Sequence, residues 1–335
     1  MLALKSKRWL KKALVRSSML EVASQLLPAS AVILSYHSIV EDPQLTSQIL
    51  GISQSRANFE AHMKTVAQQF SPVTVEEVAE FARNGRQLPP RAVAVSFDDG
   101  FADNYTVALP VLSHYGIRAT FYVTVNAVTT GTLPWYCRLR FALNTTSKPE
   151  WRSLEGGGTY SLVSPQERKA AVQAAWEIAA RMTGAVQQEF VDAVEKSLET
   201  QPGGARNRYM MTWDQVRALR KEGHTIGGHT LSHPNVAHVS TSEARSEIIE
   251  CKKRLEEEMS EPVDHFSYPH PALNPQWSPQ TLEITREAGF KSAALTTCGP
   301  VRAGDEPLAL KRIYSASDLD EFTWNLQCTF LGRSI

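Results

Sequence analysis

The sequence lacks any unbroken apolar run near the 18 or so residues that a membrane-spanning helix needs, which excludes a transmembrane helix. It has no glycine-rich phosphate loop and no GxSxG nucleophile motif. Excess charge is also absent, because 35 Lys and Arg balance 35 Asp and Glu, so no global field attracts nucleic acid. Cysteine is scarce, and without a Cys-x-x-Cys pair it indicates neither a disulfide framework nor a zinc ribbon. The four cysteines are Cys137, Cys251, Cys298 and Cys328.

What is present is the composition of an ordinary globular protein. Hydrophobic residues make up 42% of the 335 positions and charged residues 21%, which excludes a disordered or collagen-like chain. At about 150 residues per domain, the length fits two ordinary domains or one large α/β barrel.

The first thirty residues concentrate positive charge. Six basic residues precede the first acid, Glu21, and apolar residues recur between them at helical spacing. Arg16 and Glu21 interrupt the apolar positions, so a secretory signal peptide fits poorly. Two interpretations fit about equally: a basic amphipathic helix that contacts an anionic membrane through residues 1–27, or an ordinary packed helix. We therefore expect a cytoplasmic protein, or one peripheral at the inner face of a bacterial membrane.

Short apolar strands alternate with helical patterns from residue 31 onward. The expected strands are 31–36, 91–97, 118–125, 224–228, 263–268 and 292–297. The alternation stops over 126–204, which we interpret as a mostly helical insertion, with helices at 165–182 and 186–198, that forms a flap or wall over the site. The two flanking parts, 31–125 and 205–335, then form one discontinuous parallel barrel with its site at the carboxyl ends of the strands.

Two carboxylates follow the second expected strand, in the sequence SFDDG. Adjacent carboxylates such as Asp98 and Asp99 repel one another and are costly to bury. A metal ion would relieve this for one carboxylate and leave the other free as a base. The alternative is an ordinary strand-to-helix turn, because Asp-Gly pairs are common in turns.

Two histidines follow another strand, in the sequence GGHTLSHP. His229 and His233 lie four residues apart, so their side chains share a face if the segment turns helically. One carboxylate and two histidines form a usual ligand set for a catalytic divalent ion. Asp99, His229 and His233 would supply it.

The third polar cluster is FSYPHP. Pro269 leaves Tyr268 as the last residue with a free backbone N–H before the turn, and an oriented N–H there can stabilise an oxyanion. His270 is a candidate acid, although a histidine in such a turn is more often simply solvated.

Together, SFDDG, HTLSHP and FSYPHP resemble the motifs of the NodB-homology polysaccharide deacetylases, carbohydrate esterase family 4. The resemblance covers about 31–125 and 209–313. It implies a distorted (β/α)7 barrel and a divalent metal, usually zinc. It also implies Asp98 as general base, a metal-ligand set and an oxyanion contact from the Tyr268 N–H. The implied ligands are Asp99, His229 and His233.

The sequence departs from the family pattern at two points, of which the first concerns the general base and the second concerns the general acid. FSYPHP lacks the arginines that hold the base aspartate, a feature that resembles an FxYP-type branch of the family; Arg312 in LKRI could supply the charge, or could bind substrate. No histidine follows His270, so the family's late histidine has no counterpart. Either His270 takes its role, or metal-bound water and solvent suffice, or the protein is impaired in turnover. His37, after the first strand, is a further candidate for contact with the substrate.

We expect a metal-dependent deacetylase that acts on N-acetylated amino sugars of a surface or capsular polysaccharide, or on its lipid-linked precursor. Three alternatives remain: the same chemistry on an O-acetyl ester, peptidoglycan, a chitin-like oligomer or a cyclic amide, a glycan-binding protein without turnover, or a structural metal site. The aromatic residues of the insertion could stack on sugar rings, but packing is the more common role. They are Trp135, Tyr136 and Trp151.

Overall fold

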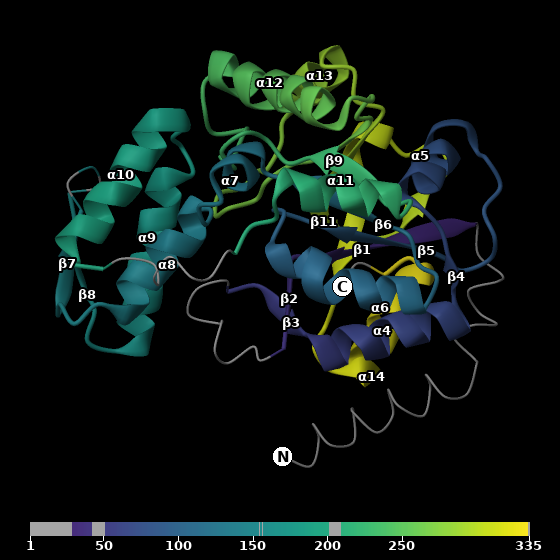
Figure 1. Cartoon of the computed structure of the whole chain (residues 1–335), viewed down its shortest axis with the longest axis horizontal. Coiled ribbons are helices and arrows are strands. Elements are labelled where there is room, and N and C mark those ends of the chain that lie inside the picture. Colours follow the sequence, from purple (N-terminus) through teal and green to yellow (C-terminus); the bar gives the residue numbers. More distant parts are fainter. Residues whose placement is uncertain (1–28, 42–50, 154, 156, 201–208, 334–335) are drawn as a thin grey trace.

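Seven parallel strands form a closed barrel with helices around it (Figure 1). The structure is a computed structural model and describes residues 29–41, 51–153, 155, 157–200 and 209–333. In order around the barrel, the strands are β1 (Ser30–Tyr36), β5 (Ala92–Phe97), β6 (Ala119–Val123), β9 (Thr225–Gly228), β10 (His265–Ser267), β11 (Ser292–Cys298) and β13 (Leu310–Tyr314). Since β13 pairs with β1, the ring closes, and the expected (β/α)7 barrel is confirmed.

The seventh strand, β13, is the one that the alternating pattern did not predict. Its sequence, LKRIY, places two basic residues in the middle of a strand, whereas parallel barrel strands are usually continuous apolar runs. Arg312 is nevertheless only 1% exposed. A buried arginine inside the wall of a barrel needs an acidic partner, and that partner lies in the site.

The remaining strands are short and lie outside the seven-stranded ring. They are β2 (Ser38–Val40), β3 (Ser53–Ser55), β4 (Ser71–Pro72), β7 (Glu150–Arg152), β8 (Thr159–Ser161) and β12 (Val301–Arg302). β4 and β12 extend the barrel sheet by pairing with β5 and β1, and the others form two separate two-stranded sheets.

Helices follow most barrel strands and cover the outside of the ring. They are α4 (Arg56–Gln69), α5 (Val75–Asn84), α6 (Leu109–His114), α7 (Val125–Thr130), α11 (Trp213–Lys221), α12 (Thr241–Met259), α13 (Pro279–Glu287) and α14 (Leu319–Phe330), with a π-helical turn (Asn104–Ala108) before α6 and a 3-10 turn (Pro307–Ala309) before β13. Thr74, Thr212 and Ser240 form reciprocal capping boxes. These caps satisfy orphan backbone groups in the first turns of α5, α11 and α12.

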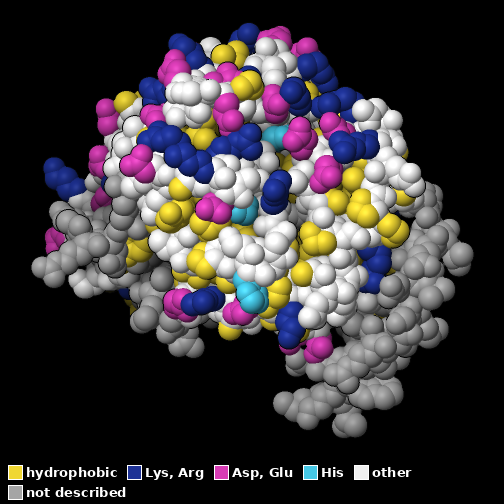
Figure 2. All heavy atoms as spheres, turned by 45° about the vertical axis from the view of Figure 1, so that its right-hand side comes forward, with side chains coloured by type: hydrophobic (Ala, Val, Ile, Leu, Met, Phe, Trp, Pro, Cys, Tyr) yellow, Lys and Arg dark blue, Asp and Glu magenta, His cyan; other side chains and the backbone are white. Residues whose placement is uncertain are grey.

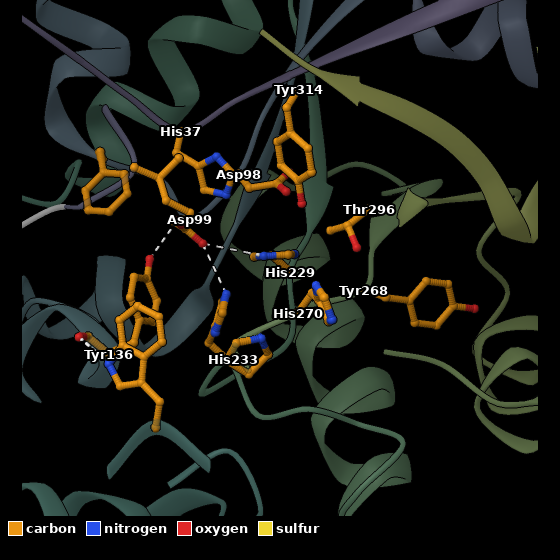
Figure 3. A pocket seen from close by; sticks show the side chains of 14 residues that line it. His37, Asp98, Asp99, Tyr136, His229, His233, Tyr268, His270, Thr296 and Tyr314 are labelled. Atoms are coloured by element: carbon orange, nitrogen blue, oxygen red, sulfur yellow. Dashed lines mark hydrogen bonds and ion pairs between the residues drawn. The ribbon is translucent and has the colours of Figure 1, made fainter. Parts of the chain in front are cut away.

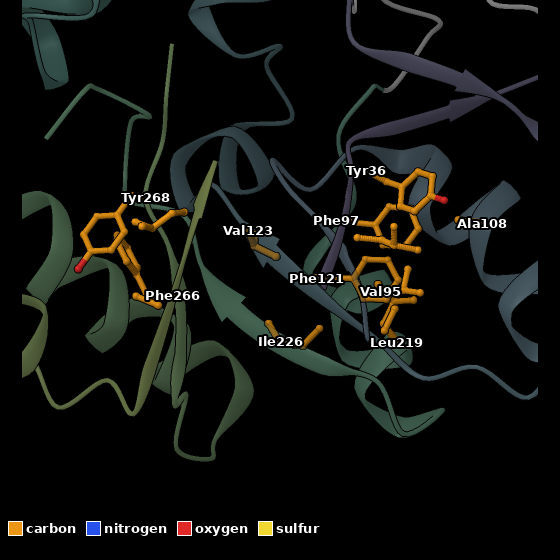
Figure 4. Packing of buried hydrophobic residues seen from close by; sticks show 14 of the residues in the cluster. Tyr36, Val95, Phe97, Ala108, Phe121, Val123, Leu219, Ile226, Phe266 and Tyr268 are labelled. Carbon is orange, nitrogen blue, oxygen red and sulfur yellow. The ribbon is translucent and has the colours of Figure 1, made fainter. Parts of the chain in front are cut away.

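Aromatic packing between the outer face of the barrel and α4 fixes the end of β5. The rings of Phe97 and Phe121 stack with centroids 4.8 Å apart, and Tyr36 stacks on Phe97 at 5.5 Å (Figure 4). Each such pair contributes about 0.5–1.5 kcal/mol beyond the burial of its area. Because Phe97 directly precedes Asp98, this packing sets the position from which the two carboxylates project.

The insertion forms a helical body beside the barrel, at the left of Figure 1. Its helices are α8 (Trp135–Thr145), α9 (Pro165–Ala179) and α10 (Gly184–Ser197), and they share one cluster of buried apolar side chains. The two helices expected at 165–182 and 186–198 are confirmed, whereas α8 was not predicted. The division of the chain into domains at residues 126 and 204 stays a prediction.

The charge of the surface and the lengths of the helices can be compared with the expected charge balance and the expected lack of a transmembrane helix. Basic and acidic side chains are interspersed over the face that Figure 2 presents, in keeping with the balanced composition. No helix in the described part of the chain combines the length and apolarity that a membrane span requires. The expected basic N-terminal segment lies within 1–28, outside the described residues.

Two glycines let β9 approach its neighbours closely. A Cβ on Gly227 would lie 2.6 Å from the ring of Tyr122 and 2.8 Å from the backbone oxygen of His265. A Cβ on Gly228 would lie 2.9 Å from the sulfur of Cys251 on α12. Lack of a side chain therefore sets the depth at which β9 packs, and with it the position of the histidine that follows.

We expect Gly227→Ala to lower the free energy of unfolding by about 1–3 kcal/mol, because the added methyl overpacks a site whose neighbour is backbone. Denaturant unfolding measures this. Gly158→Ala is the matched control, since its Cβ would meet only the half-buried Tyr160 side chain at 3.1 Å. Equal stability of the two variants would contradict the close-approach argument.

Candidate metal centre

Polar side chains from several strands meet at the carboxyl end of the barrel. Asp98 and Asp99 follow β5, His229 follows β9, His37 follows β1 and His270 lies just beyond β10. All five line one pocket (Figure 3). Because the carboxyl ends of parallel strands open on the same side of a barrel, residues far apart in sequence converge here.

Asp99, His229 and His233 form a compact buried triad. The Nε2 atoms of His229 and His233 lie 3.5 and 3.3 Å from Oδ1 of Asp99. One ligand atom from each residue falls within 4.8 Å of the others, and all three side chains are buried. The structure thus brings together the three residues that the sequence predicts as metal ligands.

The donor set fits a divalent cation. Oδ1 of Asp99 is buried without a hydrogen-bond partner, which is unfavourable for a carboxylate oxygen unless a cation faces it. Nδ1 of His229 lies 2.7 Å from the carbonyl oxygen of Ser267 and donates to it, which leaves Nε2 as the free lone pair. Burial lowers the pKa of His229 to about 4, so the imidazole is neutral, as a ligand must be.

Asp99 is ionised in this setting. Burial works against its charge, but the close approach of the His233, His37 and His229 side chains holds the pKa of Asp99 below its usual value. Two imidazole nitrogens and one carboxylate oxygen, with positions left open, are typical of catalytic zinc sites.

The HTLSHP segment reaches this geometry as a loop and not as a helical turn. Thr230 and His233 both have positive φ, 64° and 63°, a region that residues other than glycine rarely adopt. The carboxylate of Glu247 on α12 accepts the backbone N–H groups of Leu231 and Ser232, each at 2.9 Å. These bonds hold the strained backbone, so α12 fixes the orientation of His233.

The insertion supplies a residue that sequence reasoning did not place in the site. Tyr136, in the first turn of α8, donates its hydroxyl to Oδ2 of Asp99 at 2.6 Å. Burial and the charge of Asp99 raise the pKa of Tyr136 well above its ordinary value, so the hydroxyl remains a donor. The Trp135-Tyr136 pair was visible in the sequence, but nothing in its spacing pointed to a carboxylate partner.

Asp98 lies beside the triad in an ion pair with Arg312. The guanidinium donates to both carboxylate oxygens, at 2.8 and 2.7 Å, and Arg312 also donates to Ser267 Oγ at 3.0 Å. Burial opposes ionisation, but Arg312 holds the pKa of Asp98 below its usual value. Arg312 therefore contacts Asp98 in the way expected of a substitute for the missing motif arginines. Arg312 does not line the pocket, so the alternative role in contact with substrate has no support in its position.

Tyr268 differs from expectation. Its backbone N–H donates to the carbonyl of Ala294 at 3.1 Å, because hydrogen bonding between β10 and β11 continues one residue past the end of β10. Its side chain points away from the triad (Figure 3) and donates to Thr285 at 3.0 Å. The free oxyanion donor predicted from Pro269 is thus already engaged in the sheet, which corrects that prediction.

The two histidines that line the pocket outside the triad, His37 and His270, differ in their surroundings. His270 is half-buried at the pocket wall, and its Nε2 lies 2.9 Å from the side-chain oxygen of Asn274. His37 faces the two carboxylates (Figure 3), and its Nδ1 is buried without a partner. The rest of the wall is largely apolar and aromatic. It includes Ile52, Phe101, Trp176, Pro271 and Tyr314.

Known proteins resemble this chain in sequence and in fold. Residues 85–293 match the family model described as polysaccharide deacetylase. YxkH of Bacillus subtilis (strain 168), provisionally named as a polysaccharide deacetylase, is 20% identical over 287 residues, which are 85% of this chain and 71% of YxkH.

Of two further similarities, the first covers a short stretch of sequence and the second is a similarity of structure. Poly-beta-1,6-N-acetyl-D-glucosamine N-deacetylase of Escherichia coli (strain K12) is 30% identical over 84 residues, 25% of this chain and 12% of the relative. The structure of the Streptococcus pyogenes deacetylase PplD, in complex with acetate, superposes with a TM-score of 0.60 at 19% identity. It covers 91% of this chain and 99% of PplD, which supports the fold.

We expect the purified chain to bind one Zn²⁺, and His233→Ala to weaken that binding by about 100-fold or more, since one of three ligands is lost. Competition with a chromophoric chelator measures the affinity. His114→Ala, which removes an exposed histidine at the end of α6, is the control and keeps the affinity of the unaltered chain. Unchanged zinc binding in His233→Ala would rule out the triad as the metal site.

Proposed function

Since the chain belongs to the polysaccharide deacetylase family, we propose that it is a metal-dependent hydrolase that removes acetyl groups from N-acetylated amino sugars of a polysaccharide. The observation that carries this proposal is the pairing of a buried, arginine-held Asp98 with an adjacent Asp-His-His triad. A hydrolase of this kind needs a base beside a metal site, and these residues offer both.

We assign the general base to Asp98. Its carboxylate lines the pocket next to the triad, while Arg312 fixes its orientation and keeps it ionised. An ionised carboxylate held in one position accepts a proton from water as that water attacks. The metal that Asp99, His229 and His233 would hold supplies Lewis acidity, which polarises the acetamide carbonyl and makes water a better nucleophile.

The leaving amine needs a proton, and we assign its delivery to His37 in preference to His270. The imidazole of His37 faces Asp98 and Asp99, and its Nδ1 has no hydrogen-bond partner among the described residues. By contrast, Nε2 of His270 already bonds to Asn274.

The wall of the pocket favours a neutral acetylated sugar. Trp176, Tyr314 and Ile52 offer apolar and aromatic surface beside the triad, which suits the acetyl methyl group and a sugar face. The partial similarity to the E. coli enzyme, named for poly-β-1,6-N-acetylglucosamine, supports N-acetylglucosamine as the first sugar to test.

We propose that the natural substrate is a surface or capsular glycan or its lipid-linked precursor, and that the chain belongs to the FxYP-type branch. The FSYPHP sequence and the Arg312 to Asp98 ion pair support that branch. Peripheral membrane contact through residues 1–27 remains part of the proposal and rests on the sequence alone.

Acetate release from N-acetylglucosamine oligomers tests the function. We expect the zinc-loaded protein to release acetate, chelation to abolish release, and Asp98→Asn to lower the rate by about 10²–10⁴-fold while one zinc stays bound. The retained zinc shows that the variant keeps its site. If the zinc-loaded protein releases no acetate from any N- or O-acetylated glycan, the hydrolase proposal fails and a glycan-binding role replaces it.

Substitution of His37 and of His270 in turn tests which of the two delivers the proton to the leaving amine. We expect His37→Gln to lower kcat by about 10²-fold or more, because the leaving amine loses its proton donor, and His270→Gln to change kcat less than tenfold. Steady-state kinetics at saturating zinc measures both. A larger loss in His270→Gln than in His37→Gln would reverse the assignment.

A further inference from the structure

We propose that Tyr136 is a positioning residue for the metal ligand Asp99, and that the first turn of α8 is therefore a working part of the metal centre. The inference rests on the metal site proposed above but not on the identity of the substrate. It gives the insertion a function beyond that of the expected flap or wall over the site.

The two oxygens of Asp99 have different tasks. Oδ1 faces the Nε2 atoms of the two ligand histidines and has no hydrogen-bond partner, while Oδ2 accepts the Tyr136 hydroxyl at 2.6 Å. The phenol therefore fixes the rotation of the carboxylate and directs one oxygen to the place where the three ligand atoms converge. Asp99 is 1% exposed, so water cannot replace a lost phenol without rearrangement.

A second ligand touches the same turn of helix. The indole N–H of Trp135 donates to the backbone carbonyl of His233 at 3.1 Å, and the ring centroids of Tyr136 and His233 lie 4.8 Å apart. His233 has a φ of 63°, a strained backbone that needs support from its surroundings. Adjacent residues of α8 thus contact one ligand through its side chain and another through its backbone.

The first turn of α8 is itself firmly held. The indole N–H of Trp176 on α9 donates to the carbonyl of Tyr136 at 3.0 Å. Arg138, one residue beyond Cys137, forms a buried ion pair with Glu195 on α10, with an Nε to Oε1 distance of 2.9 Å. The helices of the insertion therefore hold Tyr136 against the barrel. A flap motion of α8 would break buried hydrogen bonds at the metal ligands.

Outer partners of metal ligands commonly change affinity by about 10–100-fold when they are removed. We expect Tyr136→Phe to raise the zinc dissociation constant by that factor, because it removes only the hydroxyl and keeps the ring. Tyr160→Phe is the matched control, since it removes a hydroxyl from the same insertion, in β8, where the ring stacks on Trp151 and lines no part of the pocket. Chelator competition on the full chain measures both constants.

Three further readouts separate positioning from general stability. In the metal-free form, Tyr136→Phe should lower the free energy of unfolding by less than the free energy that it removes from zinc binding, and Tyr160→Phe should lower it little. Excess zinc should restore most of the acetate release of Tyr136→Phe. The visible spectrum of the Co²⁺-loaded protein should change in Tyr136→Phe alone, because the spectrum reports ligand geometry.

Two outcomes overturn the proposal. One is a zinc dissociation constant for Tyr136→Phe equal to that of Tyr160→Phe. The other is a weaker affinity accompanied by an equally large loss of stability in the metal-free form, which would make Tyr136 an ordinary packing residue. Zinc affinity is measured without substrate, so the result holds even if the protein deacetylates none of the glycans tested.

Discussion

Two carboxylates placed side by side in a buried site determine what the rest of the structure must provide. Asp98 and Asp99 are 2% and 1% exposed, and a buried charge without a partner is strongly unfavourable. The fold provides separate partners for the two charges. An arginine in the wall of the barrel pairs with Asp98, while imidazoles and a phenol surround Asp99. Loss of either set of contacts would leave a buried charge uncompensated, so the chemistry of the site and the stability of the barrel depend on the same bonds.

Much of this arrangement could be predicted from the sequence, for identifiable reasons. The barrel follows from alternating apolar strands and helices, and the triad follows because each motif lies at the end of a strand. The contact between Arg312 and Asp98 was anticipated because the absent motif arginines left a base aspartate in need of a positive charge. The strands and the triad could be predicted because neighbouring residues in the sequence indicate them. The role of Arg312 could be predicted because the arginines of the family motif are missing.

The features that escaped prediction depend on tertiary contacts. Tyr136 lies in a helix of the insertion, and only the packing of α8 against the barrel brings its hydroxyl to Asp99. The N–H of Tyr268 is engaged because of the register between β10 and β11, which the FSYPHP sequence does not encode by itself. The loop from His229 to His233 replaces a helical turn because Glu247, fourteen residues beyond His233, binds its backbone.

The ion pair in the barrel wall also links the site to the order in which the chain is made. Asp98 and Arg312 are 214 residues apart, so a growing chain emerges with the carboxylate long before its guanidinium. Until β13 takes its place between β11 and β1, the charge of Asp98 has no partner and favours contact with water. Closure of the ring and neutralisation of that charge are therefore a single late event, and a ribosome-bound chain that ends before residue 310 cannot yet have assembled the site.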